Sequence, residues 1–384
     1  MFTLRLGRWM KVAYLIQSQN SAFDTPYYVL HPKPTPRLSR ADTPTFPLSS
    51  TTSPGKMSIF LDFDGTITTE DTVAHLANFA LRFQSERQPR DEGRSTAHGT
   101  SSTSTSTQIQ NSPFVEAVTQ EREKGDLSSR WDDVVHAYVS DYKSHASSYT
   151  PCATDRQCVE DEVAFLRSQK HVETRSLARI NECALFRGIS RDAFREAGRQ
   201  LVRDGTVRLR PGFADFVRAA LAKGWRVNVV SVNWSAAFIE GACGFAEGEV
   251  CVFANEVREG DGAVLGPGVL AGDGLLVDDE RDELPRGRNL TNSRDKHDAV
   301  REVMRKHAAK DGPFLYFGDS TTDMECLLEA TRGVVVADDE NSTLINTLRR
   351  IGKSIPHVRD AEADEELVWA SNFEEVMGST FDFN

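Results

Sequence analysis

The sequence predicts an α/β fold: a Rossmann-like parallel sheet core with an inserted helical cap domain. From Gly205 onward, short apolar segments alternate with amphipathic ones, and one further apolar segment, SIFLDFD at Ser58–Asp64, lies far upstream. The residues between them carry apolar side chains at helical spacing and few strand signals. Strands that alternate with helices form parallel sheets with helices on both faces. We therefore predict a core of residues 57–67 plus 206–384 and a helical cap at 68–205.

The length and composition of the chain limit the classes of function that it can have. The chain has 384 residues, which suits two domains or one large domain with an insertion. Its net charge of −12 argues against nucleic acid as a partner. No apolar run approaches the roughly 18 to 20 residues that a membrane span requires. Six cysteines without a CxxC pair are typical of reduced thiols in the cytoplasm, and no obligate protein partner is predicted.

The first 56 residues differ from the rest. Three basic residues, Arg5, Arg8 and Lys11, precede the first acid, Asp24. This composition resembles that of a mitochondrial transit peptide. A disordered arm is the alternative, as is a start at Met57, directly before the first predicted strand. The expected location is thus cytoplasmic, with mitochondrial as the alternative.

The predicted cap is a series of helices with one low-complexity insertion. The segment 69–83 reads as its first helix, and the insertion, rich in Ser and Thr, covers 85–113. Ser190 precedes the last helix as a plausible N-cap. The remaining helices are predicted at 128–145, 158–186 and 190–202.

The predicted core alternates strands and helices up to the C-terminal region. Pro211 opens its first helix and Gly224 closes it. Ser371 and Glu374 have the spacing of a capping box at the last helix. Strands are predicted at 225–232, 250–257, 313–319, 333–338 and 367–370, a hairpin at 263–270, and further helices at 295–309, 322–330 and 371–377.

Polar side chains gather where the predicted strands end. Asp62 and Asp64 close the first strand, Ser231 follows the second, and Asp319 follows the strand at 313–319. Ligands of open α/β sheets bind beyond the carboxyl ends of the strands.

Two further residues belong to this predicted cluster. Asp323 lies four residues after Asp319, and Lys296 opens the preceding helix. Clustered carboxylates need a cation, and hard oxygen ligands select Mg²⁺, so Asp62, Asp64, Asp319 and Asp323 are the candidate metal ligands. The lysine would neutralise an anionic substrate.

These residues resemble the four motifs of the haloacid dehalogenase superfamily. The match consists of DFDGT, NVVS, Lys296 and GDSTTD, in the family's order, and the helical insertion resembles its C1-type cap. The resemblance implies that Asp62 is the nucleophile that forms an aspartyl-phosphate. It also implies that Asp64 is the general acid and base and that Ser231 and Lys296 bind the phosphoryl oxygens. Mg²⁺ would bind Asp62, the backbone carbonyl of Asp64, and Asp319, while Asp323 is either a further ligand or a residue that supports one.

The chain is most similar to the phosphoserine phosphatase-like branch of that superfamily. An acid at position 64 favours a phosphomonoester phosphatase or a mutase, and TITTED and FANEV are the further cues. Two features depart from the branch: SVNWS replaces its Gly-Gly after the motif-two serine, and Asp71 stands where it has Glu. Asp71, Asn233 and Trp234 are therefore candidate specificity residues, with helix capping and packing as their alternative roles.

The expected activity is Mg²⁺-dependent hydrolysis of a small phosphorylated metabolite. A catalytically weak regulatory or binding protein is one alternative, although intact catalytic residues argue against it. A phosphotransferase or phosphomutase is the other.

Overall fold

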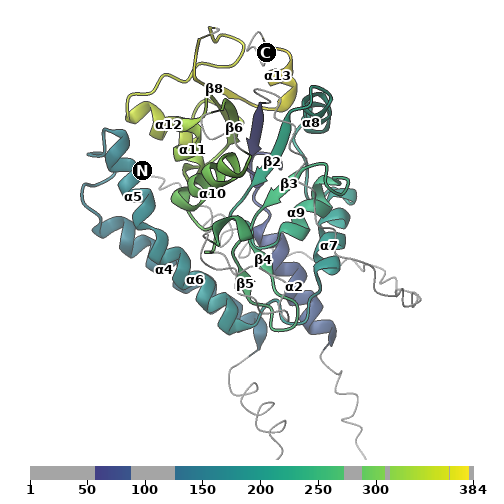
Figure 1. Ribbon diagram of the computed structural model, residues 1–384. Coiled ribbons are helices and arrows are strands. Elements are labelled where there is room, and N and C mark those ends of the chain that lie inside the picture. The colour runs from purple at the N-terminus through teal and green to yellow at the C-terminus, as the bar shows by residue number, and fades with distance from the viewer. Residues whose placement is uncertain (1–56, 88–125, 272–287, 308–311, 363, 380–384) are drawn as a thin grey trace, which may run out of the picture.

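The core is a six-stranded sheet in which every neighbouring pair is parallel (Figure 1). The computed structural model describes residues 57–87, 126–271, 288–307, 312–362 and 364–379. The strand order is β3-β2-β1-β6-β7-β8, which places the first strand in the middle of the sheet. The strands are β1 Ser58–Leu61, β2 Arg226–Val230, β3 Cys251–Phe253, β6 Phe314–Gly318, β7 Arg332–Val336 and β8 Leu367–Ala370. The predicted fold class is confirmed.

Alternate residues of the buried strands face two separate cores. Ile59 and Leu61 belong to one apolar cluster, whereas Phe60 between them belongs to the other, as the period of two in a strand requires. Both faces of the sheet are covered, so the strands are apolar throughout. Helices of the first cluster include α8 Phe213–Ala222, α9 Ala236–Cys243 and α13 Phe373–Met377, and those of the second include α10 Ser293–Lys306, α11 Met324–Glu329 and α12 Thr343–Arg350.

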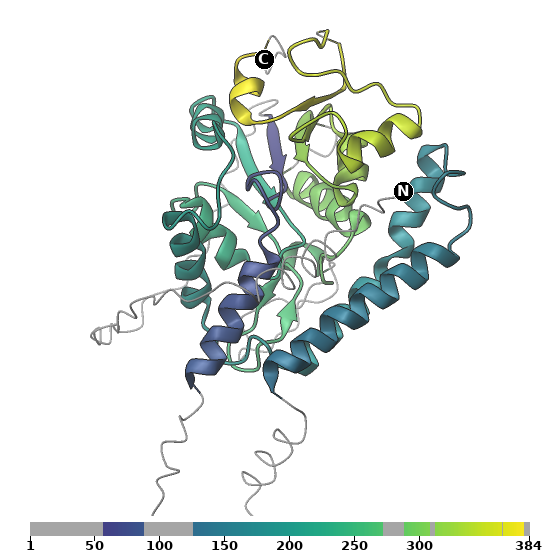
Figure 2. The same ribbon diagram turned by 180° about the vertical axis from the view of Figure 1, so that it is seen from behind.

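Five described helices separate β1 from α8, the helix that precedes β2. Of these, α4 and α6 lie side by side as a long pair beside the sheet (Figure 2). Helix α7 packs instead on α9, so closely that a Cβ at Gly241 would lie 1.9 Å from the carbonyl oxygen of Arg195. The five helices are α2 Val73–Arg87, α4 Leu127–Ser148, α5 Val159–Ser168, α6 Lys170–Cys183 and α7 Arg191–Arg203.

Several predicted boundaries in the first half of the chain were wrong. Strand β1 ends at Leu61, because Asp62 and the residues after it turn away into a loop. The following helix starts at Val73, four residues later than predicted. The helix predicted at 158–186 is two helices that meet at Gln169. Nothing in the apolar spacing marks this break.

The region around the predicted hairpin also differs. The segment 250–257 is divided between β3 in the large sheet and β4 Glu256–Val257, which pairs with β5 Val264–Leu265. The turn of this hairpin contains Gly260 and Gly262, both with positive φ. The predicted hairpin at 263–270 was therefore placed too late. Its second half contains a short 3₁₀ helix, Gly268–Leu270.

Helix caps were predicted with mixed success. The side chain of Ser190 accepts a hydrogen bond from the Ala193 backbone N–H, as predicted. The capping box at Ser371 and Glu374 was displaced by one residue, because Asn372 is the N-cap and accepts from the Glu375 N–H.

The polar insertion predicted at 85–113 begins later than expected. Residues 85–87 belong to α2, and 88–113 lie outside the described residues, as do 1–56 with their predicted arm or transit peptide. Among the helices of the described part, none combines the length and apolarity that crossing a bilayer requires.

Candidate active site

The carboxyl ends of three adjacent strands bring the predicted catalytic residues together. Strand β1 lies between β2 and β6, with Leu61 opposite both Val229 and Phe317. Asp62, Ser231 and Asp319 each follow one of these strands directly. Because the strands are parallel and in register, their ends meet at one edge of the sheet.

A fully buried lysine joins two of the acids. The Nζ of Lys296 lies 2.9 Å from Oδ2 of Asp62 and 2.6 Å from Oδ1 of Asp323, and none of the three side chains is exposed. Buried charges are tolerated only when they are paired, so removal of either partner leaves a costly unpaired charge. Helix α10 places the lysine in its first turn through a capping box between Asn292 and Asp295.

Asp323 is surrounded by donors. Besides Lys296, its Oδ1 accepts a hydrogen bond from the Tyr316 hydroxyl at 2.8 Å. Its Oδ2 accepts from both the backbone N–H and the hydroxyl of Ser320, at 3.1 and 3.0 Å. Burial, and then the nearby Asp323 charge, raise the pKa of Tyr316 well above its usual value, so the phenol remains a donor. Asp323 thus fixes the lysine and the loop after β6.

Three carboxylates form a group with the dimensions of a metal site. Oxygens of Asp62, Asp319 and Asp323 all lie within 4.8 Å of one another. The three negative charges face one lysine, which leaves an excess that a divalent cation would balance. The donors are all hard carboxylate oxygens, so this group fits Mg²⁺. The side chain of Asp64 is not part of it.

Gly65 allows Asp319 to approach the loop that follows β1. Its φ is +77°, and a Cβ there would lie 2.3 Å from Oδ2 of Asp319. Both facts require glycine. The hydroxyl of Thr66 lies 3.3 Å from Oδ1 of Asp319 and donates to it.

Arg210 supports the same loop and was missed by the sequence analysis. Its guanidinium is buried and donates two hydrogen bonds to the carbonyl oxygen of Gly65, at 3.1 and 2.9 Å. It also pairs with Asp338 at 2.7 Å. No motif marks this arginine, because it contacts a backbone atom distant in sequence.

Asp64 accepts hydrogen bonds from two polar residues, Thr72 and Asn233. Its Oδ1 accepts from the backbone N–H and the hydroxyl of Thr72, at 2.8 and 2.6 Å. Its Oδ2 accepts from the side-chain amide of Asn233 at 3.0 Å. Asn233, one of the candidate specificity residues, is fully buried and contacts Asp64.

The other two candidate specificity residues occupy different positions. Trp234 is almost fully buried and packs edge-to-face against Trp131 and Phe186, yet it borders a cavity between cap and core. Asp71 is partly exposed, and its Oδ1 accepts from the Val73 N–H at the start of α2. The cavity is lined by residues of both parts, among them Tyr138, Tyr142, Glu173, Trp234 and Thr322.

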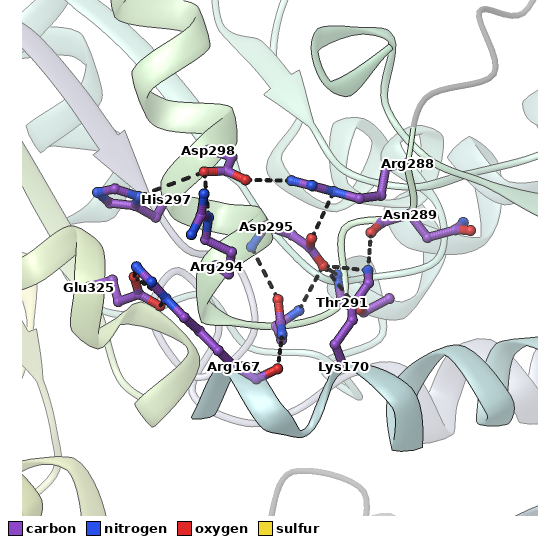
Figure 3. Close-up of polar contacts among 11 residues, drawn as sticks. Arg167, Lys170, Arg288, Asn289, Thr291, Arg294, Asp295, His297, Asp298 and Glu325 are labelled. Carbon is purple, nitrogen blue, oxygen red and sulfur yellow. Dashed lines mark hydrogen bonds and ion pairs between the residues drawn. The ribbon is translucent and has the colours of Figure 1, made fainter. Parts of the chain in front are cut away.

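The predicted cap is joined to the core by two ion pairs next to the predicted catalytic residues (Figure 3). Lys170, at the start of α6, lies 2.7 Å from Oδ2 of the buried Asp295, the neighbour of Lys296. Arg167, near the end of α5, forms a two-pronged pair with Glu325. Both carboxylates belong to core helices, so the junction of α5 and α6 is attached directly beside the site.

One family model matches part of the chain. Residues 161–328 match the model of the haloacid dehalogenase-like hydrolases. The match begins within α5 and ends within α11, so it contains Ser231, Lys296, Asp319 and Asp323 but not Asp62. No curated protein matches the sequence.

Several solved structures are similar at low sequence identity. A substrate-bound phosphoserine phosphatase complex is 11% identical with a TM-score of 0.40, covering 84% of this chain and 97% of that one. A phosphoserine phosphatase from T. onnurineus is 17% identical with a TM-score of 0.34, covering 85% and 96%. Cytosolic 5′-nucleotidase IIIB bound to cytidine is 13% identical with a TM-score of 0.38, covering 77% of each chain. At these scores the likeness supports no claim about the substrate.

The family match and the structure support the resemblance noted in the sequence. The four motifs lie at the carboxyl end of one parallel sheet, with the helical insertion directly after the first. Residues 161–328 are thus similar to the haloacid dehalogenase-like hydrolases.

Proposed function

We propose that this protein is a Mg²⁺-dependent phosphatase that hydrolyses a small phosphate monoester through an aspartyl-phosphate on Asp62. The observation that carries the proposal is the buried contact of Asp62 with Lys296, beside Asp319 and at the end of the central strand. A nucleophilic carboxylate must remain ionised, and a buried ammonium at 2.9 Å keeps it so. The same ammonium would neutralise phosphoryl oxygens during transfer.

The first half-reaction would use two acids in different roles. An oxygen of Asp62 attacks phosphorus, and the bond from phosphorus to the ester oxygen breaks. Asp64 donates a proton to that oxygen, so the leaving group departs as an alcohol. Ser231 and Lys296 are placed to bind the phosphoryl oxygens in this step.

The second half-reaction would reverse the role of Asp64. Its carboxylate, now without the proton, removes a proton from a water molecule that attacks the phosphorus of the aspartyl-phosphate. The bond to Asp62 breaks, inorganic phosphate leaves, and both acids return to their starting states.

The acid cluster suits the predicted metal ion. Asp62 and Asp319 are the side chains that would hold Mg²⁺, together with the backbone carbonyl of Asp64. When bound, the ion supplies positive charge against the phosphoryl group. Asp323 already accepts from Lys296, Tyr316 and Ser320, so its proposed role is to fix the lysine.

The proposed substrate is a small metabolite rather than a macromolecule. The cap is attached beside the site by Arg167 and Lys170, and the cavity between cap and core is narrow. Asp71 and Trp234 are the proposed contacts to the leaving group. Nucleic acid, membranes and an obligate protein partner form no part of the proposal, and a cytoplasmic location is proposed with it.

A panel of small phosphate esters tests the activity. Phosphate release would be measured with Mg²⁺, with EDTA, and with an added acceptor alcohol that separates hydrolysis from phosphotransfer. We expect Mg²⁺-dependent release of inorganic phosphate from at least one ester. Release that is unchanged in EDTA would contradict the metal assignment, and transfer to the alcohol in place of water would indicate a phosphotransferase.

A further inference from the structure

Asp64 is fixed by two residues from different parts of the chain. Thr72 directly precedes α2, at the entrance to the cap, and Asn233 follows the motif-two serine. The Asn233 amide nitrogen lies 3.0 Å from Oδ2 of Asp64 and 3.1 Å from the Thr72 hydroxyl, and it donates to both. All three side chains are buried, with at most 1% of their surface exposed.

The orientation of the Asn233 amide follows from its other contacts. Its Oδ1 accepts a hydrogen bond from the Ser235 backbone N–H at 3.2 Å, so its nitrogen must face Asp64. Its backbone N–H donates to the Ser231 hydroxyl at 3.2 Å, and its carbonyl accepts from the Asn255 side chain at 3.1 Å. Asn233 is therefore held at four points and cannot turn toward a substrate without breaking them.

These contacts distinguish the two oxygens of Asp64. An oxygen of a carboxylate has two lone pairs, and Thr72 occupies both on Oδ1 with its N–H and its hydroxyl. Proton exchange with a leaving group then falls to Oδ2, the oxygen that Asn233 contacts. The side-chain amide of Asn233 has two hydrogens, of which one is bound to Oδ2 and the other to the Thr72 hydroxyl. Because the contact to Thr72 fixes the amide, the amide in turn fixes the direction of Oδ2.

From this geometry we propose that Asn233 and Thr72 are positioning residues that orient Asp64 for proton transfer. The inference rests on the proposed phosphatase function and deepens it. It replaces a direct specificity role for Asn233. General acid catalysis depends on placing the proton within hydrogen-bond reach of the leaving oxygen, so a rotated carboxyl would lose most of its effect.

The test compares esters that differ in their need for an acid. An alkyl phosphate requires protonation of its leaving oxygen, whereas p-nitrophenyl phosphate releases a stabilised phenolate without it. The quantity measured is kcat/KM with Mg²⁺, which reports the steps up to departure of the leaving group when that departure is irreversible. The variants are Asn233→Ala and Thr72→Val, with Thr72→Ser to restore the hydroxyl.

We expect a loss that depends on the leaving group. Asn233→Ala and Thr72→Val should lower kcat/KM for the best alkyl ester by about 10- to 100-fold, within the range of general acid catalysis. For p-nitrophenyl phosphate the loss should stay within about threefold, since the acid contributes little there. Thr72→Ser should recover most of the alkyl ester activity that Thr72→Val loses.

Other outcomes would overturn the inference or the function beneath it. An equal loss on both esters would mean that the two residues only support the fold, and no loss on either would mean that Asp64 needs no such support. If Asn233→Ala does not fold, the same test uses kcat/KM of Thr72→Val and Thr72→Ser on the two esters. A wild-type protein that hydrolyses neither ester would instead overturn the proposed phosphatase function.

Discussion

At the scale of single residues, the site is a set of charged side chains that stabilise one another. Lys296 is completely buried between Asp62 and Asp323, and Asp319 adds a third acid within 4.8 Å. Each removal therefore acts on its neighbours as well as on itself. Two substitutions at different positions therefore test the proposed metal ligand Asp319 and the backbone conformation at Gly65 one at a time.

Asp319→Ala should weaken Mg²⁺ binding as well as catalysis. The substitution removes one of the carboxylates that would hold the ion, while the contact of Asp62 with Lys296 remains. Activity at low Mg²⁺ should fall at least tenfold, and raising the Mg²⁺ concentration should restore part of it. Mg²⁺ titrations of kcat/KM measure this shift. A variant with an unchanged Mg²⁺ dependence would show that Asp319 is not a ligand.

Gly65→Ala should damage the site through steric contact. The new Cβ would lie 2.3 Å from Oδ2 of Asp319, in addition to about 1–2 kcal/mol for a left-handed alanine. Gly205→Ala is the matched control, since Gly205 has φ +78° and nothing within 4 Å of the added Cβ. Both variants should lose stability from the left-handed strain in denaturant unfolding, with a larger loss for Gly65→Ala because of the added steric contact, and only Gly65→Ala should lose tenfold or more in kcat/KM. Equal kinetics in the two would refute the steric argument.

The positions of single residues were predictable where a polar side chain directly follows a strand of the sheet. The positions of Asp62, Ser231 and Asp319 at one edge follow from a parallel sheet, whose order brings their strands together. The contact of Asn233 with Asp64 was not predicted, because the two residues lie 169 positions apart in the sequence. Arg210 contacts a distant backbone carbonyl, which no side-chain pattern reveals.

At the scale of elements, the junction of α5 and α6 is one place where the inserted helices attach to the core. The break between α5 and α6 at Gln169 places Arg167 and Lys170 on either side, each facing a buried core carboxylate. Periodicity predicted the helices, since apolar spacing is local. It did not predict the break, because the ion pairs are made with α10 and α11, far along the chain.

Lys170→Met should loosen the attachment of the cap. Asp295 would lose a hydrogen-bonded cation at 2.7 Å but would keep its contacts to Thr291, Asn292 and Arg288. The free energy of unfolding should fall by about 1–2 kcal/mol, and KM should rise more than kcat falls. Lys353→Met, at an exposed position, serves as the control. A variant that matches this control in both readouts would mean that the pair does not hold the cap.

At the scale of the whole molecule, the helices between β1 and α8 form the proposed lid of an acidic site. The insertion leaves the sheet directly after Asp62, and Thr72 at its start already contacts Asp64. Alternation of strands and helices was enough to predict this architecture, because each βα unit is patterned locally. The substrate was not predictable, since the cavity is lined by residues of five separate segments.

Such a lid should restrict the protein to small esters. A cap that closes over the phosphorylated aspartate to exclude bulk water would also leave little room for a folded macromolecule. We expect kcat/KM for folded phosphoproteins to lie at least 100-fold below that of the best small ester. Asp71→Ala should change the ranking of small esters more than it changes hydrolysis of an aryl phosphate. Comparable rates on phosphoproteins would show that the cap does not close the site.

The covalent intermediate is the most direct test of the account. The protein would be mixed with its best ester and Mg²⁺, quenched in acid within a turnover, digested and analysed by mass spectrometry. The account predicts one added phosphoryl group on the peptide that contains Asp62, and none in Asp62→Asn, which should also lose about 10³-fold or more in turnover. Phosphorylation of another residue, or full turnover by Asp62→Asn, would contradict it.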